Sequence, residues 1–357
     1  MEKLNIWPLM KAEKPLIIAG PCSAETEEQV LETARQLKTK GVDIFRAGIW
    51  KPRTRPGSFE GIGTIGLKWL KRVQEETGLP VATEVANTRH VEETLKNGVD
   101  VLWIGARTTA NPFAVQEIAD ALKGVDIPVL VKNPVNPDIQ LWMGAIERLE
   151  KAGIYKVGAI HRGVSQFEKS IYRNNPEWQM PLKLKKLRQD ILMINDPSHI
   201  AGNRQLLSNI AQIALDLNFD GLMIEAHIDP DNALTDAQQQ ITPTEMELLI
   251  HQLTKPGIVI SGTISSNIEK MRNIIDYLDD QLIDLLSFRM KVAVEIGEYK
   301  KKNNLPVLQE NRWKELLLKN AEKGVQKNLS KAFVASLFNA IHQESLHKQN
   351  RILKKLK

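Results

Sequence analysis

The 357-residue chain has only one cysteine, no long apolar run and no recognisable signal sequence. A single thiol, Cys22, cannot form an internal disulfide, which excludes the small disulfide-stapled secreted proteins. The longest apolar runs are far shorter than the roughly 20 residues that a bilayer-spanning helix needs. Residues 1–15 are interrupted by charge and lack an apolar core followed by a cleavage site. We therefore expect a cytoplasmic protein without a membrane segment.

Net charge is small over most of the chain but not at its carboxyl end. Residues 268–357 contain 18 Lys and Arg against 11 Asp and Glu, whereas residues 1–267 contain 30 against 32. A basic segment of this kind suits nucleic acid, a membrane surface, an anionic small molecule, or simply a solvated helix. No aromatic stacking platform accompanies these cations, which argues against a nucleic-acid partner. The composition, with 42% hydrophobic and 25% charged residues, is that of a globular protein.

Eight short apolar runs recur through the first two thirds of the chain. Their starts are about 29 residues apart on average, which suits a strand, a crossover helix and their connections. The runs are continuously apolar rather than alternating, as expected for parallel strands that are buried on both faces. Eight such units predict an α/β fold, a closed (β/α)8 TIM barrel. The runs start at Leu16, Val42, Pro80, Val99, Pro128, Tyr155, Ile191 and Asp220.

The remainder of the chain reads as a small all-α domain with one long helix. From Ile268 to about Lys302, apolar residues recur three and four positions apart, and no proline occurs before Pro306. Such a helix is roughly 50 Å long and cannot bury its apolar side alone, so we expect a homodimer formed through this domain. Two shorter helices are expected within 311–323 and 330–349. The predicted organisation is a barrel over 1–255, a linker over 256–267 that contains Pro256 and Gly257, and a helical domain over 268–357.

The catalytic side chains of a barrel lie at the carboxyl ends of its strands. There this sequence has Cys22, His199 and Glu225, with Asp236 eleven residues after Glu225. Taken singly, a cysteine is usually a small buried apolar group and a loop histidine or aspartate is usually a cap. Together, a thiolate, an imidazole and two carboxylates are ligands for a borderline divalent ion such as Mn²⁺, Fe²⁺, Co²⁺ or Zn²⁺.

Six cationic side chains also follow the predicted strands. The structural alternative is pairing with surface carboxylates, but arginines that follow buried strands are poorly placed for it. So many cations at one mouth require anions, and two phosphorylated substrates, or one with a carboxylate and a phosphate, would neutralise them. The six are Arg46, Lys51, Arg53, Arg107, Lys132 and Arg162.

Several motifs in this part of the chain together resemble the 3-deoxy-D-arabino-heptulosonate 7-phosphate (DAHP) synthases, over about residues 15–255. The motifs are GPCS at 20, KPRT at 51, GARTTANP at 105, VKNP at 131, HRG at 161, DPSHIAG at 196 and ALTDAQQ at 233. The resemblance implies a site for a divalent metal ion, with Mn²⁺ favoured, held by Cys22, His199, Glu225 and Asp236. It implies that phosphoenolpyruvate is bound by Arg46, Lys51, Arg107, Lys132 and Arg162. Erythrose 4-phosphate is implied to bind at Lys51, Pro52, Arg53 and Thr54.

The resemblance also implies the reaction. The metal polarises the aldehyde oxygen, C3 of phosphoenolpyruvate attacks that carbonyl, and water adds at C2 before phosphate leaves. Lys51 is the candidate proton donor to the new alkoxide, with Lys132 or a metal-bound water as alternatives. The related synthases of 3-deoxy-octulosonate 8-phosphate have Ala-Asn-Arg after the lysine, so KPRT favours the four-carbon aldose phosphate.

The cations of the tail are spaced for a small anion. Arg289 and Lys300 are eleven residues apart, which puts them on one side of a helix at about 16 Å separation. Arg272 lies 17 residues before Arg289 and is rotated by about 100°, so it cannot reach the same ligand within one helix. If Arg272 binds a ligand, it therefore does so in a second chain.

The tail resembles the all-helical chorismate mutases from about Ile268 to Gln349. The family's binding positions are implied to be Arg272, Arg289, Lys300, Arg312, Ser345 and Gln349. Two positions depart from the pattern, because Gln309 replaces the usual Asp and Trp313 the usual Glu. The rearrangement of chorismate to prephenate needs no cofactor; fixed cations hold the two carboxylates, while Lys300 and Gln349 act as the catalytic pair at the ether oxygen.

The sequence thus predicts a bifunctional shikimate-pathway enzyme that acts on small molecules only. An alternative is a synthase whose helical tail is a non-catalytic module for dimerisation and effector sensing, a reading that Trp313 favours. We also expect feedback, because prephenate and chorismate are formed downstream of DAHP and the helical domain would bind them.

Overall fold

The computed structural model describes residues 14–52, 57–166, 170–253, 264–303 and 310–354. The chain divides into two compact units, Met1–Gly262 and Thr263–Lys357. Most of the predicted linker at 256–267 lies outside the described residues, but a helix already begins at Ile264. No glycine or proline interrupts the sequence between Gly262 and Gly297, so nothing in it opposes a helix that starts this early. Among the described helices, none has the length and apolarity needed to span a membrane.

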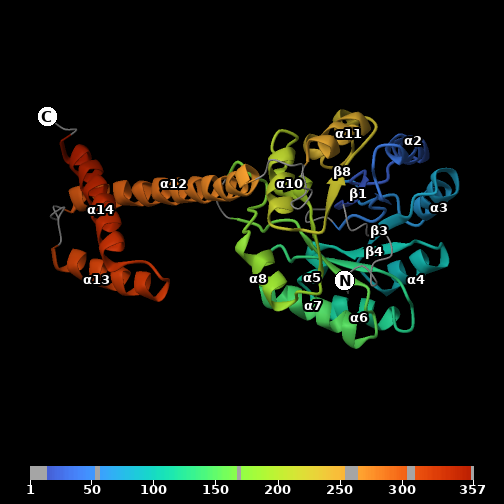
Figure 1. Ribbon diagram of the computed structural model, residues 1–357, viewed down its shortest axis with the longest axis horizontal. Coiled ribbons are helices and arrows are strands. Elements are labelled where there is room, and N and C mark those ends of the chain that lie inside the picture. Colours follow the sequence, from blue (N-terminus) through green and yellow to red (C-terminus); the bar gives the residue numbers. More distant parts are fainter. Residues whose placement is uncertain (1–13, 53–56, 167–169, 254–263, 304–309, 355–357) are drawn as a thin grey trace. The chain divides into compact units, whose positions relative to one another are not determined.

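The first unit is a closed barrel of eight parallel strands, each paired with its neighbours along the chain and the last with the first. All eight predicted runs form strands, so the predicted fold is confirmed (Figure 1). The strands are β1 (Leu16–Gly20), β2 (Ile44–Arg46), β3 (Val81–Val85), β4 (Val101–Ile104), β5 (Val129–Lys132), β6 (Val157–His161), β7 (Leu192–Asn195) and β8 (Gly221–Glu225).

Helices follow the strands and several begin at a capping side chain. Asn111 accepts hydrogen bonds from the amides of Phe113 and Ala114, while Pro112 occupies the first turn, where no amide donor is needed. The helices are α2 (Glu27–Lys38), α3 (Ile65–Thr77), α4 (Thr88–Lys96), α5 (Ala106–Thr109), α6 (Pro112–Ala121), α7 (Ile139–Lys151), α8 (Gln179–Leu187), α9 (Pro197–Ala201), α10 (Leu207–Asp216) and α11 (Pro243–Gln252). Two short 3₁₀ turns, η1 (Pro230–Asn232) and η2 (Ala237–Gln239), lie between β8 and α11.

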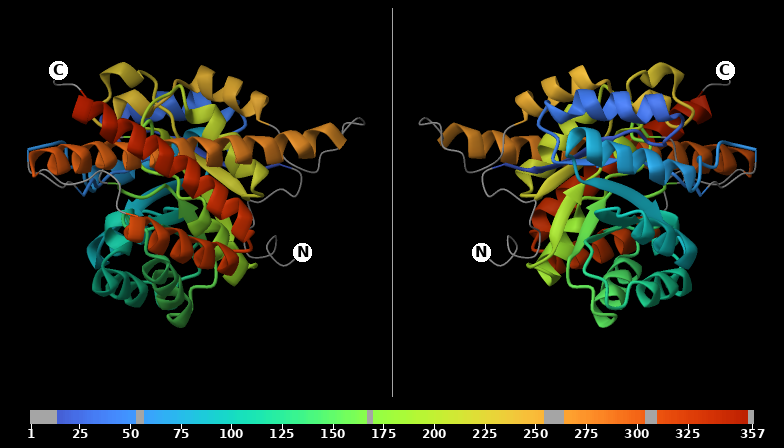
Figure 2. Two further views of the ribbon diagram at one scale, coloured as in Figure 1. Left: turned by 90° about the vertical axis from the view of Figure 1, so that its left-hand side faces the viewer. Right: turned by 90° about the vertical axis from the view of Figure 1, so that its right-hand side faces the viewer.

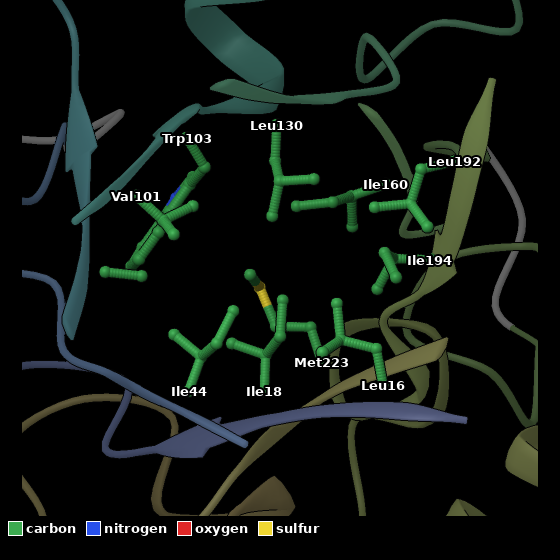
Figure 3. Close-up of a cluster of buried hydrophobic side chains, with 11 residues drawn as sticks. Leu16, Ile18, Ile44, Val101, Trp103, Leu130, Ile160, Leu192, Ile194 and Met223 are labelled. Atoms are coloured by element: carbon green, nitrogen blue, oxygen red, sulfur yellow. The ribbon is translucent and has the colours of Figure 1, made fainter. Parts of the chain in front are cut away.

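The barrel interior is filled by side chains from all eight strands (Figure 3). Trp103 is the largest of them and is fully buried, and its indole N–H donates to Glu84 at 3.0 Å. At the end of β1, Gly20 has a φ of +149°, and a Cβ there would lie 2.1 Å from the carbonyl oxygen of Arg46. Only glycine fits this position, from which the chain turns into the Pro21-Cys22 segment.

The second unit consists of α12 (Ile264–Lys302), α13 (Glu310–Gln326) and α14 (Lys331–Lys354). Helix α14 packs against both of the others (Figures 1 and 2). The prediction of an all-helical region with one long helix is therefore confirmed. The contact buries Met290 and Ala293 of α12 and Ser345 of α14, but much of the apolar surface of α12 remains exposed.

Candidate functional site

The four predicted metal ligands converge at the carboxyl end of the barrel. Ligand atoms of Cys22, Glu225 and Asp236 all lie within 4.8 Å of one another. The Cys22 Sγ atom is 3.4 Å from Asp236 Oδ2, and the Nε2 atom of His199, on α9, lies 3.8 Å from Glu225 Oε1. Asp236 has a left-handed φ of 51°, a strained conformation that aspartate tolerates better than most residues.

A buried carboxylate ties together two loops that carry these ligands. One oxygen of Glu25 accepts hydrogen bonds from Ser23 Oγ at 3.1 Å and from the Leu234 amide at 2.8 Å. Ser23 Oγ also lies 2.6 Å from Thr235 Oγ1. Ser23 follows Cys22 and Thr235 precedes Asp236, so this network fixes the thiol and the carboxylate relative to each other.

The protonation of these groups suits metal binding. Burial, reinforced by Glu225, raises the pKa of the Cys22 thiol to about 12. Burial also acts to raise the pKa values of Glu225 and Asp236, but His199 and nearby arginines outweigh it and both pKa values are lowered. The site therefore contains a neutral thiol and two ionised carboxylates. A divalent cation would replace the thiol proton and bind the resulting thiolate, so the donor set fits such an ion.

An inner aspartate orients His199. Asp196, at the amino-terminal cap of α9, lies 3.0 Å from His199 Nδ1 and accepts a hydrogen bond from Lys132 Nζ at 2.7 Å. Burial opposes ionisation of Asp196, but His199 and Lys132 outweigh it and lower the pKa of this carboxyl well below its usual range. With Nδ1 engaged, Nε2 of His199 is left on the side of Glu225, which is the arrangement of a metal-binding histidine.

Next to the four ligands is a polar cavity, and four of the six predicted cations line it: Lys51, Arg107, Lys132 and Arg162. Burial lowers the pKa of Arg162 to about 10, which still leaves it charged at neutral pH. Pro52 also lines the cavity, whereas Arg53 and Thr54 lie outside the described residues.

Arg46 is not among the residues that line this cavity. Its side chain is 1% exposed and donates to Glu225 Oε1 at 3.2 Å and to the carbonyl oxygen of Cys22 at 3.1 Å. The guanidinium group also lies 4.8 Å from the ring centroid of Trp103. In this structure Arg46 compensates the charge of a buried carboxylate and supports the Cys22 loop.

Arg173 is a cavity residue that sequence reasoning missed. It lines the cavity and forms an ion pair with Asp236 Oδ1 at 2.9 Å. The residue lies eleven positions after Arg162 in the connection between β6 and α8, not at a strand end. The only available signal was an arginine in a loop at the carboxyl side of the barrel.

Predicted residues of the helical unit lie on facing sides of α12 and α14. Arg289 donates to Ser345 Oγ at 2.6 Å, and burial lowers the pKa of this arginine. Gln349 is 7% exposed and packs over Gly297, where a Cβ would lie 3.0 Å from Gln349 Cγ. Burial lowers the pKa of His342 on α14. The positive charges of Arg289 and Lys300 lower this pKa further.

The other predicted positions of this unit are less fully described. Arg272 belongs to α12 and Arg312 to α13, but their side chains, like Gln309 as a whole, lie outside the described part. Trp313 is described, and its indole stacks on the imidazole of His342 with a centroid separation of 3.9 Å and an interplanar angle of 7°. An aromatic pair thus stands where the chorismate mutases that the tail resembles usually have a glutamate.

Comparison with known proteins agrees with both units. A model of the DAHP synthetase I family matches residues 10–258, and one of the chorismate mutase type II family matches residues 271–350. A phospho-2-dehydro-3-deoxyheptonate aldolase of Thermotoga maritima is 31% identical over 239 residues, covering 67% of this chain and 69% of that protein. A 2-dehydro-3-deoxyphosphooctonate aldolase of Wolinella succinogenes is 27% identical over 263 residues, which are 67% of this chain and 97% of that protein.

Solved structures of DAHP synthases match about two thirds of this chain. The crystal structure of the Thermotoga maritima aldolase, a DAHP synthase, superimposes with a TM-score of 0.61 and 28% identity, over 68% of this chain and 69% of that one. A truncated form of the 3-deoxy-D-arabino-heptulosonate 7-phosphate synthase of Thermotoga maritima has a TM-score of 0.58 and 26% identity, over 68% and 86% of the two chains. The resemblances inferred from the motifs are confirmed.

Proposed function

Because this chain belongs to the DAHP synthetase I family and carries a type II chorismate mutase domain, we propose that its barrel condenses phosphoenolpyruvate with erythrose 4-phosphate at a divalent-metal site. The two domains make it a bifunctional enzyme of the shikimate pathway. The observation that carries the proposal is the convergence of a thiol, an imidazole and two carboxylates beside a cavity lined by cations. Anionic substrates and a Lewis acid are the two things that this combination can bind. A cytoplasmic location suits it, since reducing conditions keep the Cys22 thiol free.

Cys22, His199, Glu225 and Asp236 would hold the ion, and Mn²⁺ is our first choice for it, with Fe²⁺, Co²⁺ and Zn²⁺ as alternatives. When bound, the ion supplies a Lewis acid for the aldehyde oxygen of the four-carbon substrate. The buried Glu225 keeps its charge through Arg46 and its second oxygen accepts a hydrogen bond from Gln239 at 2.7 Å. The hydrogen bonds from Arg46 and Gln239 hold the Glu225 carboxylate in one orientation, and they do not depend on which divalent ion binds.

The cations of the cavity would bind and orient both substrates. Lys132, at the end of β5, and Arg162, just after β6, reach it from adjacent strands, and Arg107 reaches it from α5. This arrangement suits the phosphate and carboxylate of phosphoenolpyruvate. A new bond then forms between C3 of phosphoenolpyruvate and the aldehyde carbon. Water adds its oxygen at C2, the C2–oxygen bond to the phosphate breaks, and inorganic phosphate leaves.

Lys51 is the residue best placed to donate a proton to the new alkoxide. Its Nζ atom lies 3.0 Å from Cys22 Sγ, so it is beside the metal ligands, and it also lines the cavity. Burial acts to lower the pKa of Lys51, but Cys22 and Glu225 outweigh it and the pKa is raised. The ammonium form is therefore the resting state, as a general acid requires.

The test is phosphate release by the purified full chain with erythrose 4-phosphate as acceptor and D-arabinose 5-phosphate as the control. We expect release with the four-carbon aldose, loss of activity in EDTA, and recovery with Mn²⁺. Activity that persists in EDTA after thorough dialysis contradicts the metal site. A preference for D-arabinose 5-phosphate would instead mean that this barrel catalyses the reaction of the phosphooctonate aldolases.

For the helical unit we propose that Arg289 and Lys300 hold the two carboxylates of chorismate, with help from Arg272 and Arg312. Lys300 and Gln349 would donate to the ether oxygen as its bond to carbon breaks. No covalent intermediate is needed, because the rearrangement is pericyclic and proceeds once the ligand is held in a reactive conformation. Disappearance of chorismate with formation of prephenate by the full chain tests this, and binding without turnover would favour the sensing alternative.

We propose that the second unit forms a homodimer through α12. This helix exposes apolar side chains spaced three and four apart, including Leu278, Leu282 and Leu285, which are 46%, 53% and 66% exposed. Such a stripe on one helix is typical of a helix–helix interface, and a second copy of α12 offers a matching surface. Sedimentation should give a dimer for the wild type and a monomer for Leu282→Lys. Asp284→Asn, which changes the charge by the same amount at an exposed position on the other side of the helix, should remain a dimer.

We further propose that prephenate or chorismate, bound to the helical unit, inhibits the barrel. The support is that a ligand of one domain is formed downstream of the product of the other, so binding would report pathway output. Synthase rates measured with increasing prephenate should fall in the wild type and not in Arg289→Ala. Equal inhibition of both proteins would mean that the effector binds to the barrel instead.

A further inference from the structure

Two buried polar atoms in the helical unit lack a hydrogen-bond partner within the described part of the chain. They are His342 Nε2 and Gln349 Oε1, both on α14. Buried polar atoms in folded proteins are nearly always hydrogen-bonded, so each such atom calls for a partner, which a water molecule or a ligand can supply. Gln349 already belongs to the proposed chorismate site, whereas His342 has no role in it so far.

His342 lies on the same face of α14 as the residues of that site. Positions 342, 345 and 349 are separated by three and then four residues, which puts the three side chains one above another on a helix. Ser345 in the middle accepts a hydrogen bond from Arg289 at 2.6 Å. The imidazole is therefore within the electrostatic reach of Arg289, and Lys300 acts on it as well.

Trp313 of α13 fixes the plane of this imidazole. The two rings are nearly parallel, at 7°, and their centroids are 3.9 Å apart. One face of the imidazole is thus covered by indole, and the ring cannot rotate without losing the stack. A ring held in this way presents Nε2 in one fixed direction.

We propose that His342, positioned by Trp313, binds the ligand of the helical unit through a hydrogen bond from its Nε2 atom to an oxygen of a small dicarboxylate. This proposal rests on the proposed mutase site and deepens it. The cations Arg289 and Lys300 select for negative charge, while an uncharged imidazole adds a directional hydrogen bond to a hydroxyl, ether or carboxylate oxygen. Burial and the two neighbouring cations lower the pKa of His342, so the ring is neutral at pH 7.

The competing explanation is that Trp313 and His342 only close the packing between α13 and α14. In that case Nε2 does not contact a ligand, and any residue that stacks equally well replaces histidine without loss of binding. Glutamine can put an amide N–H near the position of Nε2, whereas leucine keeps the volume and removes the donor. The pair of variants therefore separates hydrogen bonding from packing.

The experiment uses the full chain and prephenate as the probe, with affinity measured by calorimetry. We expect His342→Leu to bind prephenate about tenfold more weakly and His342→Gln to retain most of the affinity. His347→Gln is the matched control, because His347 is exposed on the same helix. In ¹⁵N-histidine spectra of the wild type, the Nε2 signal of His342 should shift on addition of prephenate, a readout that does not depend on the folding of any variant.

Wild-type affinity in His342→Leu, or an unshifted Nε2 signal at saturating prephenate, overturns the proposal. If the wild type binds prephenate with a shift at His342 but does not convert chorismate, only the mutase function fails and His342 remains a ligand-binding residue. If the wild type binds neither prephenate nor chorismate, both proposals are wrong.

Discussion

Both units of this chain contain buried polar atoms without a partner among the described residues, but the units differ in their buried charges. In the barrel, buried charges are paired within the chain: Arg46 with Glu225 at 3.2 Å and Lys132 with Asp196 at 2.7 Å. In the helical unit, His342 Nε2 and Gln349 Oε1 are buried without a partner among the described residues. The barrel site therefore contains charged groups that the chain itself pairs, whereas the two unpartnered atoms of the helical unit belong to uncharged groups.

The difference follows from how each fold buries surface. Eight strands and their helices enclose a core, and a closed barrel keeps the ends of all strands at one place. The other two helices of the unit cannot cover α12, which has 39 residues, so it keeps exposed apolar side chains such as Phe288 and Ile296. A buried ion pair must be complete within the chain, because an unpaired charge there costs several kcal/mol. A buried amide or imidazole that is uncharged and has no partner costs less free energy than an unpaired charge does.

The largest expected effect separates the two activities at the metal site. Cys22→Ala removes one of four ligands, and we expect a loss of synthase activity of at least about 10³-fold because the ion and its Lewis acidity are lost. Mutase activity should stay at the wild-type level, since no ligand of the helical unit is touched. Both rates, and the metal content by mass spectrometry, should be measured on one preparation. Synthase activity that survives both the substitution and EDTA contradicts the metal site.

The reciprocal test is in the helical unit. Arg289→Ala and Lys300→Ala each remove a cation from the proposed carboxylate contacts, and we expect mutase turnover to fall by about 10²- to 10³-fold. Synthase activity measured without prephenate should be unchanged. A parallel loss of both activities would mean that the two units do not act as separate sites. Circular dichroism of each variant checks that the helical content is kept.

The fold and the convergence of the four candidate metal ligands were accessible to sequence reasoning for a physical reason. The barrel repeats one unit, so its strands appear as recurring apolar runs, and Cys22, His199 and Glu225 all come at or just after such a run. Parallel strands that close on themselves bring their carboxyl ends together without further information. Convergence at one mouth therefore follows from the topology alone.

Contacts set by tertiary packing were not accessible. Arg46 follows a strand as the other cations do, yet its guanidinium turns inward to Glu225, 179 positions away. Arg173 reaches Asp236 from a loop with no strand end nearby, and Trp313 meets His342 from another helix. Each depends on side-chain direction and on partners distant in sequence, which periodicity does not encode.

A pH test examines His161, a buried histidine of the barrel whose two ring nitrogens both have partners. His161 Nε2 lies 2.5 Å from the Pro176 carbonyl oxygen, and Nδ1 lies 3.0 Å from Asn195 Nδ2. Burial lowers the pKa of His161 from 6.5 to about 4. The unfolded chain therefore takes up this proton first, and stability that is complete above pH 6.5 declines as pH falls toward 4, by about 3 kcal/mol.

Urea unfolding of the barrel between pH 7 and 4.5, in EDTA, measures this decline. We expect His161→Gln to be less stable than the wild type at pH 7 but to lose less stability on acidification. His347→Gln should follow the wild-type pH dependence, because His347 is exposed. An identical pH dependence in wild type and His161→Gln would mean that His161 does not titrate differently in the folded and unfolded states.

The smallest effect is expected at a charge cluster on the barrel surface. Arg188 contacts both oxygens of Glu150, at 2.6 and 3.1 Å, and both oxygens of Asp190, at 2.6 and 2.9 Å. The Arg188 side chain is 21% exposed, so water competes for these bonds and Arg188→Ala should cost only about 1 kcal/mol. Arg188→Lys should recover part of it, because lysine keeps the charge but not the paired geometry. Urea unfolding at neutral pH, with exposed Lys183→Ala as the control, measures both. A cost of 3 kcal/mol or more, as expected for a buried pair, would mean that the barrel relies on its surface charges as much as on Arg46 and Lys132.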